Sequence, residues 1–262
     1  MTVLPEDGPV DVAGVHLPSG RRLHPDDGDL SVLWATDEPL DDGAATWWLL
    51  HNAENGSSVI PLLLSGIGGD QGDRPWDSGE FDGGNAADIE ELVVADLLAR
   101  WWEMGVPDPE EDEDETAELL SPFTRRFPGL APAEERLIPV ETLEGVLAQF
   151  PPARLGLVVA DSPADALSVL GWRGATNYDQ APKELSAVLR SWQERFGATL
   201  VGVGFDTVHL LVTRPPRSRA SAVRAAAEHY AFCLDSVVQG AGSISALADE
   251  LIDAPVWSFW WD

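Results

Sequence analysis

A histidine and a cysteine four residues apart carry the most reactive pair of side chains in the sequence. His229 and Cys233 fall in a stretch predicted to be helical, so both can lie on one helix face. Imidazole and thiolate suit Zn²⁺ or a nucleophilic pair, and His209 and Asp235 are the remaining candidate groups. Cysteine is also among the most buried residue types. A metal site, a catalytic pair and core packing are the alternatives. Packing is favoured, because the sequence offers no complete set of ligands or catalytic partners.

Carboxylates punctuate a glycine-rich segment between residues 66 and 84. Oxygen ligands on a flexible loop are typical of hard cations such as Ca²⁺, and the candidates are Asp70, Asp73, Asp77, Glu80 and Asp82. Their spacing matches neither an EF-hand nor a regular Gly-Asp repeat. A solvated loop is therefore the favoured interpretation, and we predict no cofactor. Trp76, Asp77 and Glu80 in this segment are also candidate binding residues.

One basic island surrounds a Pro-Pro break and the start of a predicted helix. Its members are Arg214, Arg217, Arg219 and Arg224. Backbone N–H groups at a helix start favour anions. A solvated loop is one interpretation. The other is a surface that receives an acidic segment, either a partner's or the chain's own acidic run at residues 110–115.

Tryptophan is unusually frequent, with 11 residues. Most are expected in the core, because each buries a large area and its N–H needs only one partner. The closing run from Trp257 to Trp261 is too dense in aromatic residues for one alternating strand face. We therefore expect either core docking or an interface, with Trp257 and Trp260 as anchors for a partner.

The chain has 262 residues and a formal net charge of −29. The acidity is uneven, with a net charge of −26 in residues 1–150 and −3 in residues 151–262. Such a surface disfavours nucleic acid and anionic membranes and fits a basic protein partner, although solubility alone is a sufficient reason for it. A single cysteine, an N-terminus without the features of a secretory signal and the absence of a long apolar run predict a cytoplasmic location.

The pattern of elements predicts an α+β fold in two regions. Residues 1–150 form an acidic α/β region with an acidic loop at 108–118, packed on a C-terminal domain at 151–262 with a small mixed or antiparallel sheet covered by helices. A hairpin is expected to turn at Pro18-Ser19-Gly20. Further strands are predicted at 30–36, 59–67, 155–160, 200–204 and 208–213. Helices are predicted at 46–52, from 85 or 88 to 105, at 141–150, from 162 to 170, at 182–196, at 221–234 and at 245–252.

Short motifs in the C-terminal half carry a family resemblance. They include Gly171-Trp172, Gly204-Phe205-Asp206-Thr207, Arg214-Pro215-Pro216, Ala227-Glu228-His229 and Trp257-Ser258-Phe259-Trp260-Trp261-Asp262. Together they resemble the bacterial domain-of-unknown-function family four-two-five-three, common in actinobacteria, over roughly residues 151–262. Longer members are similar to the upstream half as well. The resemblance implies a fold and no activity.

Three functional interpretations stay open from the sequence, one of which is a purely structural or solubility role for the N-terminal half. The leading prediction is a protein-binding or regulatory module that resembles an immunity protein or inhibitor and acts without catalysis. Acidity, abundant tryptophan and the lack of an assembled catalytic set favour it. The alternative is a metal-dependent hydrolase or small-ligand-binding protein that uses the His229 and Cys233 region or the acidic Gly-rich loop.

Overall fold

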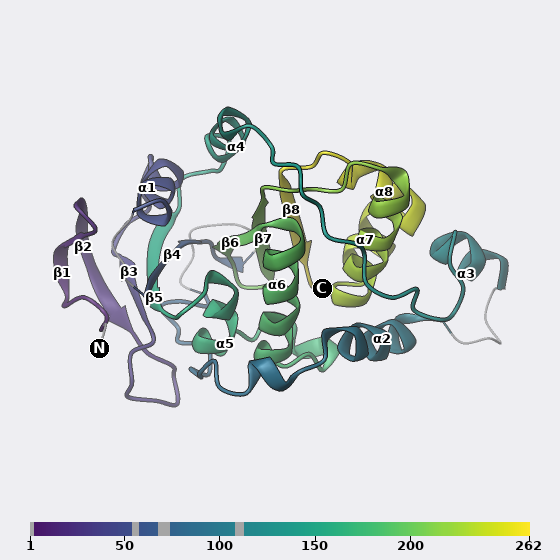
Figure 1. Ribbon diagram of the computed structural model, residues 1–262. Helices are drawn as coiled ribbons and strands as arrows, with labels where there is room; N and C mark the ends of the chain where they lie inside the picture. The colour runs from purple at the N-terminus through teal and green to yellow at the C-terminus, as the bar shows by residue number, and fades with distance from the viewer. Residues whose placement is uncertain (1–2, 54–57, 68–73, 108–112) are drawn as a thin grey trace.

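Strands from both halves of the chain form one mixed sheet in the computed structural model, which describes residues 3–53, 58–67, 74–107 and 113–262 (Figure 1). The order across the sheet is β1-β2-β3-β5-β4-β6-β7-β8. Neighbours run antiparallel except β4 and β6, which are parallel. The strands are β1 (Gly8–Val12), β2 (Val15–Leu23), β3 (Leu33–Thr36), β4 (Val59–Leu64), β5 (Arg154–Val159), β6 (Ala198–Val203), β7 (Thr207–Val212) and β8 (Val256–Trp260).

Helices cover both faces of this sheet. One face packs against α2 (Val94–Gly105), α5 (Ala166–Leu170), α6 (Pro182–Phe196), α7 (Arg219–Phe232) and α8 (Ile244–Leu251). The other face packs against α1 (Gly43–His51) and α4 (Val140–Leu147), seen at the top of Figure 1. The predicted α+β class is confirmed. In the described part of the chain, no helix is long and apolar enough to cross a membrane.

Strand β5 lies between two strands from the N-terminal half. It pairs with β3 through Trp34↔Leu157 and with β4 along its whole length. Strand β4 in turn pairs with β6 through Leu63↔Gly202. One continuous sheet therefore contains strands from before and after Pro151-Pro152, the position at which the sequence predicts a domain boundary. The separation into regions 1–150 and 151–262 stays a prediction, but the sheet is shared between them and is larger than expected.

The predicted hairpin forms, but its turn lies elsewhere. Strands β1 and β2 are joined at Ala13-Gly14, where both residues have positive φ, 54° and 80°. The expected turn residues Pro18-Ser19-Gly20 lie inside β2. Gly20 serves close packing instead, because a Cβ there would come within 2.4 Å of Ala35 O. The turn prediction was wrong because glycine meets two different needs, a left-handed backbone and a close approach.

The acidic region also departs from its prediction. Residues 113–120, expected to lie in or beside a loop at 108–118, form helix α3 (Glu113–Leu120), with Thr116 and Leu120 buried. Residues 108–112 lie outside the described residues. The preceding helix, α2, begins at Val94 and not at Asn85 or Asp88. A short 3₁₀ turn, η2 (Ile89–Glu91), follows Asp88, whose φ of 63° is incompatible with an α-helix start.

A chain limited to residues 151–262 is expected not to fold. It would lack β3 and β4, so β5 would lose both neighbouring strands and β6 one of its two. Unpaired backbone groups and exposed Leu and Val side chains would remain. Amide dispersion in NMR spectra and urea unfolding, with the full chain as control, check this. Cooperative unfolding of the fragment with native-like dispersion would contradict it.

Candidate functional site

Strand β8 ends the sheet, and one of its two backbone edges has no neighbouring strand in the described residues. Val212 N donates to Pro255 O at 2.8 Å, and Trp261 N donates to Asp206 O at 3.0 Å. Hydrogen-bonded pairs alternate along an antiparallel ladder. Residues 255, 257, 259 and 261 therefore bond to β7. The N–H and C=O groups of Val256, Ser258 and Trp260 point away from the sheet.

A groove with a volume of about 510 Å³ lies along this edge. Its walls come from β7 and β8, the end of α7, the π-helix η5 (Ser236–Ala241) and α8. The lining includes Trp257 and Phe259 from one face of β8 and Ser258 and Trp260 from the other. Because residues of both faces line the same groove, it reaches around the edge of the strand. Figure 1 shows β8 at this end of the sheet, beside α7 and α8.

The inner wall of the groove holds two polar atoms without partners. His229 Nε2 and Trp257 Nε1 are buried and have no hydrogen-bond partner among the described residues. Their ring centroids lie 4.5 Å apart, and Trp192 and Phe259 pack against the same imidazole. Burial lowers the pKa of His229 to about 3. The imidazole is therefore neutral at physiological pH.

Cys233 does not pair with His229. It lies one residue beyond the end of α7, with extended backbone, and its thiol donates to Trp260 O at 3.0 Å and accepts from Ser236 Oγ at 3.2 Å. Burial raises its pKa to about 11. Thiolate chemistry needs a lowered pKa, so this geometry does not support a Cys–His nucleophile.

The residues that the structure describes also contain no group of three or more His, Cys, Asp or Glu side chains placed to hold a metal ion. Asp235, the proposed supplementary ligand, is buried and already accepts from Tyr178 Oη, Gln239 Nε2 and Asp262 N. It anchors the C-terminus and the π-helix. The arrangement of His229, Cys233 and Asp235 therefore gives no support to a metal-dependent hydrolase.

The outer wall of the groove carries a second histidine. His209 Nδ1 lies 2.9 Å from Ser258 Oγ, and burial lowers the pKa of His209. Trp260 is 40% exposed and donates from its indole N–H to Asp206. Of the predicted candidates, His209, His229, Trp257 and Trp260 thus meet in one groove.

The edge position of Ser258 and the contributions of Leu247, Glu250 and Leu251 were not anticipated from the sequence. A polar serine between two aromatic residues was the available signal, because that alternation indicates a half-buried strand. Trp257, Phe259 and Trp261 do alternate into the core, while Trp260 faces outward. The aromatic run therefore occupies both faces of the strand, as its density indicated. The role of Trp257 and Trp260 as anchors for a partner stays a prediction.

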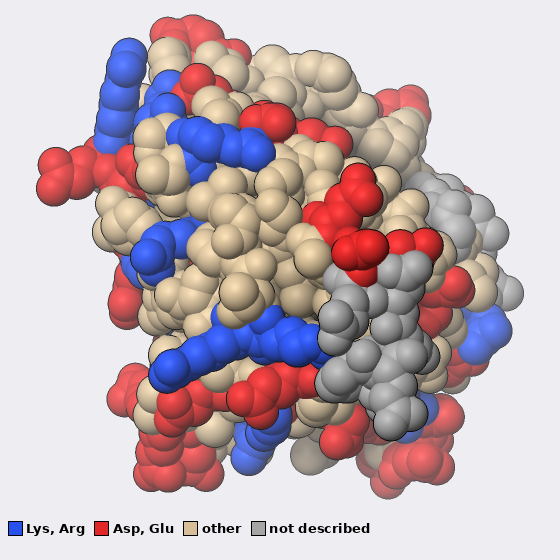
Figure 2. Space-filling model, turned by 90° about the vertical axis from the view of Figure 1, so that its right-hand side faces the viewer, with Lys and Arg blue, Asp and Glu red and all other residues tan. Residues whose placement is uncertain are grey.

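The groove is acidic. Asp235 and Glu250 line it, and no Lys or Arg occurs among its described lining residues. Glu250 is exposed at the rim. The face in Figure 2 shows Lys and Arg in separate groups among acidic and uncharged residues, not as one basic surface.

The predicted basic island is engaged within the chain. Arg217 pairs with Asp253, and Arg219 pairs with Asp249. Arg214 donates to Glu194 O at 2.6 Å, and Arg224 donates to Pro128 O at 3.0 Å. Carboxylates of α8 and of the turn after it thus lie where an acidic segment was expected to bind.

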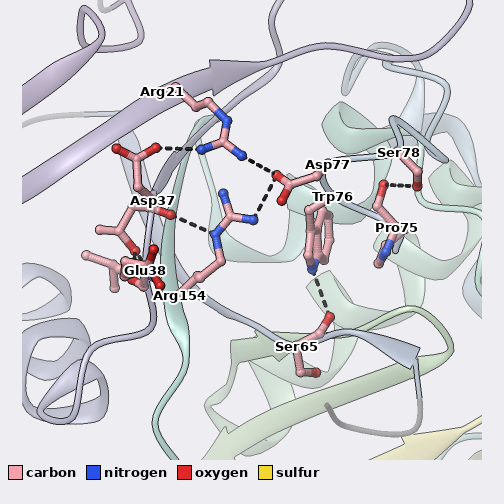
Figure 3. A network of polar contacts seen from close by, with 11 residues as sticks. Arg21, Asp37, Glu38, Ser65, Pro75, Trp76, Asp77, Ser78 and Arg154 are labelled. Atoms are coloured by element: carbon pink, nitrogen blue, oxygen red, sulfur yellow. Dashed lines mark hydrogen bonds and ion pairs between the residues drawn. The ribbon is translucent and has the colours of Figure 1, made fainter. Parts of the chain in front are cut away.

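The candidates in the Gly-rich segment are also held by intramolecular contacts. Asp77 Oδ1 accepts from Arg21 at 2.8 Å and from Arg154 at 2.9 Å, and Trp76 Nε1 donates to Ser65 O (Figure 3). Glu80 pairs with Arg74, and Asp82 pairs with Arg173. Asp70 and Asp73 lie outside the described residues. Each of the described carboxylates thus faces a guanidinium group, and the Asp77 network fastens the 74–80 loop to β2 and β5.

The fold and the groove define an α+β protein with an open sheet edge beside an acidic, aromatic groove. Residues 154–262 match the family described as Domain of unknown function (DUF4253), so the resemblance seen in the C-terminal motifs is confirmed for this segment. No curated protein and no solved structure is found to match the chain. The matched segment contains every residue of the groove, but β4 lies outside it.

The buried imidazole of His229 is expected to make folding sensitive to acid. The folded-state pKa lies below the ordinary value of 6.5, so the unfolded chain binds the additional proton as pH falls. This contribution to stability is present above about pH 6.5 and is lost progressively toward pH 3. At pH 4.5, two units below the ordinary pKa, the free energy of unfolding is lower by about 3 kcal/mol, because each pH unit contributes about 1.4 kcal/mol.

The variant His229→Leu removes this proton uptake and should lose about 3 kcal/mol less stability than the parent between pH 7 and pH 4.5. Urea unfolding at both pH values measures it, with the exposed His16→Leu as control. An equal loss of stability in the parent and in His229→Leu would contradict a neutral, buried imidazole.

Proposed function

We propose that this protein is a protein-binding module that takes an extended segment of a partner as an additional strand on β8. The observation that carries the proposal is the outward row of N–H and C=O groups at Val256, Ser258 and Trp260, which borders a groove of about 510 Å³. Main-chain hydrogen bonds give affinity in this mode of recognition, and pockets for alternate side chains give specificity.

The register of the added strand follows from one contact. The thiol of Cys233 already donates to Trp260 O, so that carbonyl is occupied. The remaining groups are N–H and C=O of Val256, N–H and C=O of Ser258, and N–H of Trp260. Bound backbone would therefore pair mainly with Val256 and Ser258, both of which line the groove.

Charge favours a basic partner. Asp235 and Glu250 line the groove, and the whole chain carries −29. A negative protein field steers a basic segment toward the groove and accelerates association at low salt. A regulator or inhibitor of a basic protein fits this pattern. Catalysis by Cys233 has less support, because its thiol is buried and its pKa is raised to about 11.

Replacing Ser258 by proline tests the added strand. Proline removes the outward N–H of residue 258, while the ladder to β7 uses residues 257 and 259. We expect Ser258→Pro to bind basic peptides at least about tenfold more weakly than the parent, since a lost hydrogen bond and a blocked edge each weaken pairing. The matched control Ser258→Ala loses the His209 contact but keeps the N–H.

The probe is an array of nonapeptides enriched in Lys and Arg, with affinities of positive peptides measured by fluorescence anisotropy. Circular dichroism establishes that both variants stay folded. Equal affinity of folded Ser258→Pro and Ser258→Ala would overturn strand addition. Failure of the parent to bind any peptide of the array would overturn the proposed function.

A further inference from the structure

We propose that the groove selects a partner strand carrying a hydroxyl or carboxamide side chain, which hydrogen-bonds to His229 Nε2 and Trp257 Nε1. The inference rests on the proposed strand addition and specifies which residue the site recognises. It starts from these two polar atoms, which are buried and unpartnered among the described residues.

Unpaired polar atoms in a protein interior are costly. A buried donor or acceptor without a partner loses about 1–3 kcal/mol relative to a satisfied one, so most such groups are paired in native proteins. Here two occur on rings whose centroids are 4.5 Å apart, and both side chains line the same groove. Two unsatisfied atoms on neighbouring rings that both line the groove indicate a place for a polar group from outside.

The chemistry of the two atoms restricts that group. Indole N–H only donates, so the ligand must accept a hydrogen bond there. His229 is neutral, and its Nε2 either accepts or donates according to the tautomer. A hydroxyl or a primary carboxamide can accept from Trp257 and can meet either tautomer of His229.

Charged groups fit less well. Ammonium and guanidinium groups cannot accept from the indole. A carboxylate could accept from both rings, but Asp235 and Glu250 line the same groove and no Lys or Arg does so in its described lining. Burying a further negative charge there without a cation is unfavourable. The recognised side chain is therefore neutral and polar.

The strand geometry places such a side chain correctly. Residues directly opposite each other in paired strands project to the same face of the sheet. A partner residue opposite Trp257 therefore projects toward the inner wall, where Leu247 and Leu251 also line the groove. Its neighbours along the strand project to the outer face, toward His209 and Trp260, where basic side chains remain in solvent.

The position of this preference is found by exchanging threonine and valine, which have the same shape, at each position of a peptide that binds the parent. We expect one position at which threonine binds about tenfold more tightly than valine, as expected for a hydrogen-bonded pair of polar atoms. Trp257→Phe removes the indole N–H and should reduce the ratio of the threonine-peptide affinity to the valine-peptide affinity to near one. The control Trp260→Phe, an aromatic residue of the outer wall, should retain it.

NMR of the parent protein tests the same contact without replacing a buried residue, a change that could itself disturb the fold. The side-chain ¹⁵N and ¹H resonances of Trp257 and His229 should shift on binding the threonine peptide, and to a much smaller extent on binding the valine peptide. Peptides that bind with equal affinity for threonine and valine at every position, and without these shifts, would overturn the inference and leave strand addition intact. Absence of any peptide binding would instead overturn the proposed function.

Discussion

Every buried backbone N–H and C=O group needs a hydrogen-bond partner, and this requirement organises the protein around its sheet. Each strand from β2 to β7 has neighbours on both sides, including β5, which is inserted between β3 and β4. Only the edge strands, β1 and β8, have backbone groups that no neighbouring strand pairs with in the described residues. Strand β1 is irregular in register between Gly8 and Val10, and Gly8 has a φ of 109°. Such a bulge discourages edge pairing. Strand β8, which has the same length, instead pairs with β7 in an unbroken register over five residues and has a groove beside it.

The rigidity of that edge comes from the aromatic core behind it. Trp192 stacks on Phe259 at 5.4 Å and meets Trp257 edge-on at 5.5 Å, so the inward side chains of β8 are locked against α6 and α7. Trp192 Nε1 donates to Glu228, which is fully buried and paired with Arg195. Glu228 also accepts from Ala131 N, tying the 131 segment to both helices. A partner strand would thus meet a preorganised edge, which lowers the entropy lost on binding.

The sequence predicted local structure well where one signal dominated. The stripe of apolar residues in α6, with Pro182 at its start and Gly197 after it, gave a helix with the bounds observed. Predictions failed where one residue type serves two purposes, as with Gly20 in β2 and the acidic residues that begin α3. For the site, His209, His229, Trp257 and Trp260 were identified as chemically interesting. Their meeting place depends on the pairing of β7 with β8 and on the path of α8, which no local pattern encodes.

The candidate site is therefore indicated less by the reactive side chains than by the unpaired backbone groups of β8. Cys233 and Asp235 are used within the fold, and the groove acquires its character from β8, α8 and two unpartnered ring nitrogens. Amide hydrogen exchange of the free protein, resolved residue by residue with NMR, tests the central claim most directly. An open edge predicts strong protection of Trp257 and Phe259, which bond to β7, and rapid exchange at Val256 and Ser258 between them. Uniform protection from 256 to 260 would show that the edge is already covered and would contradict strand addition.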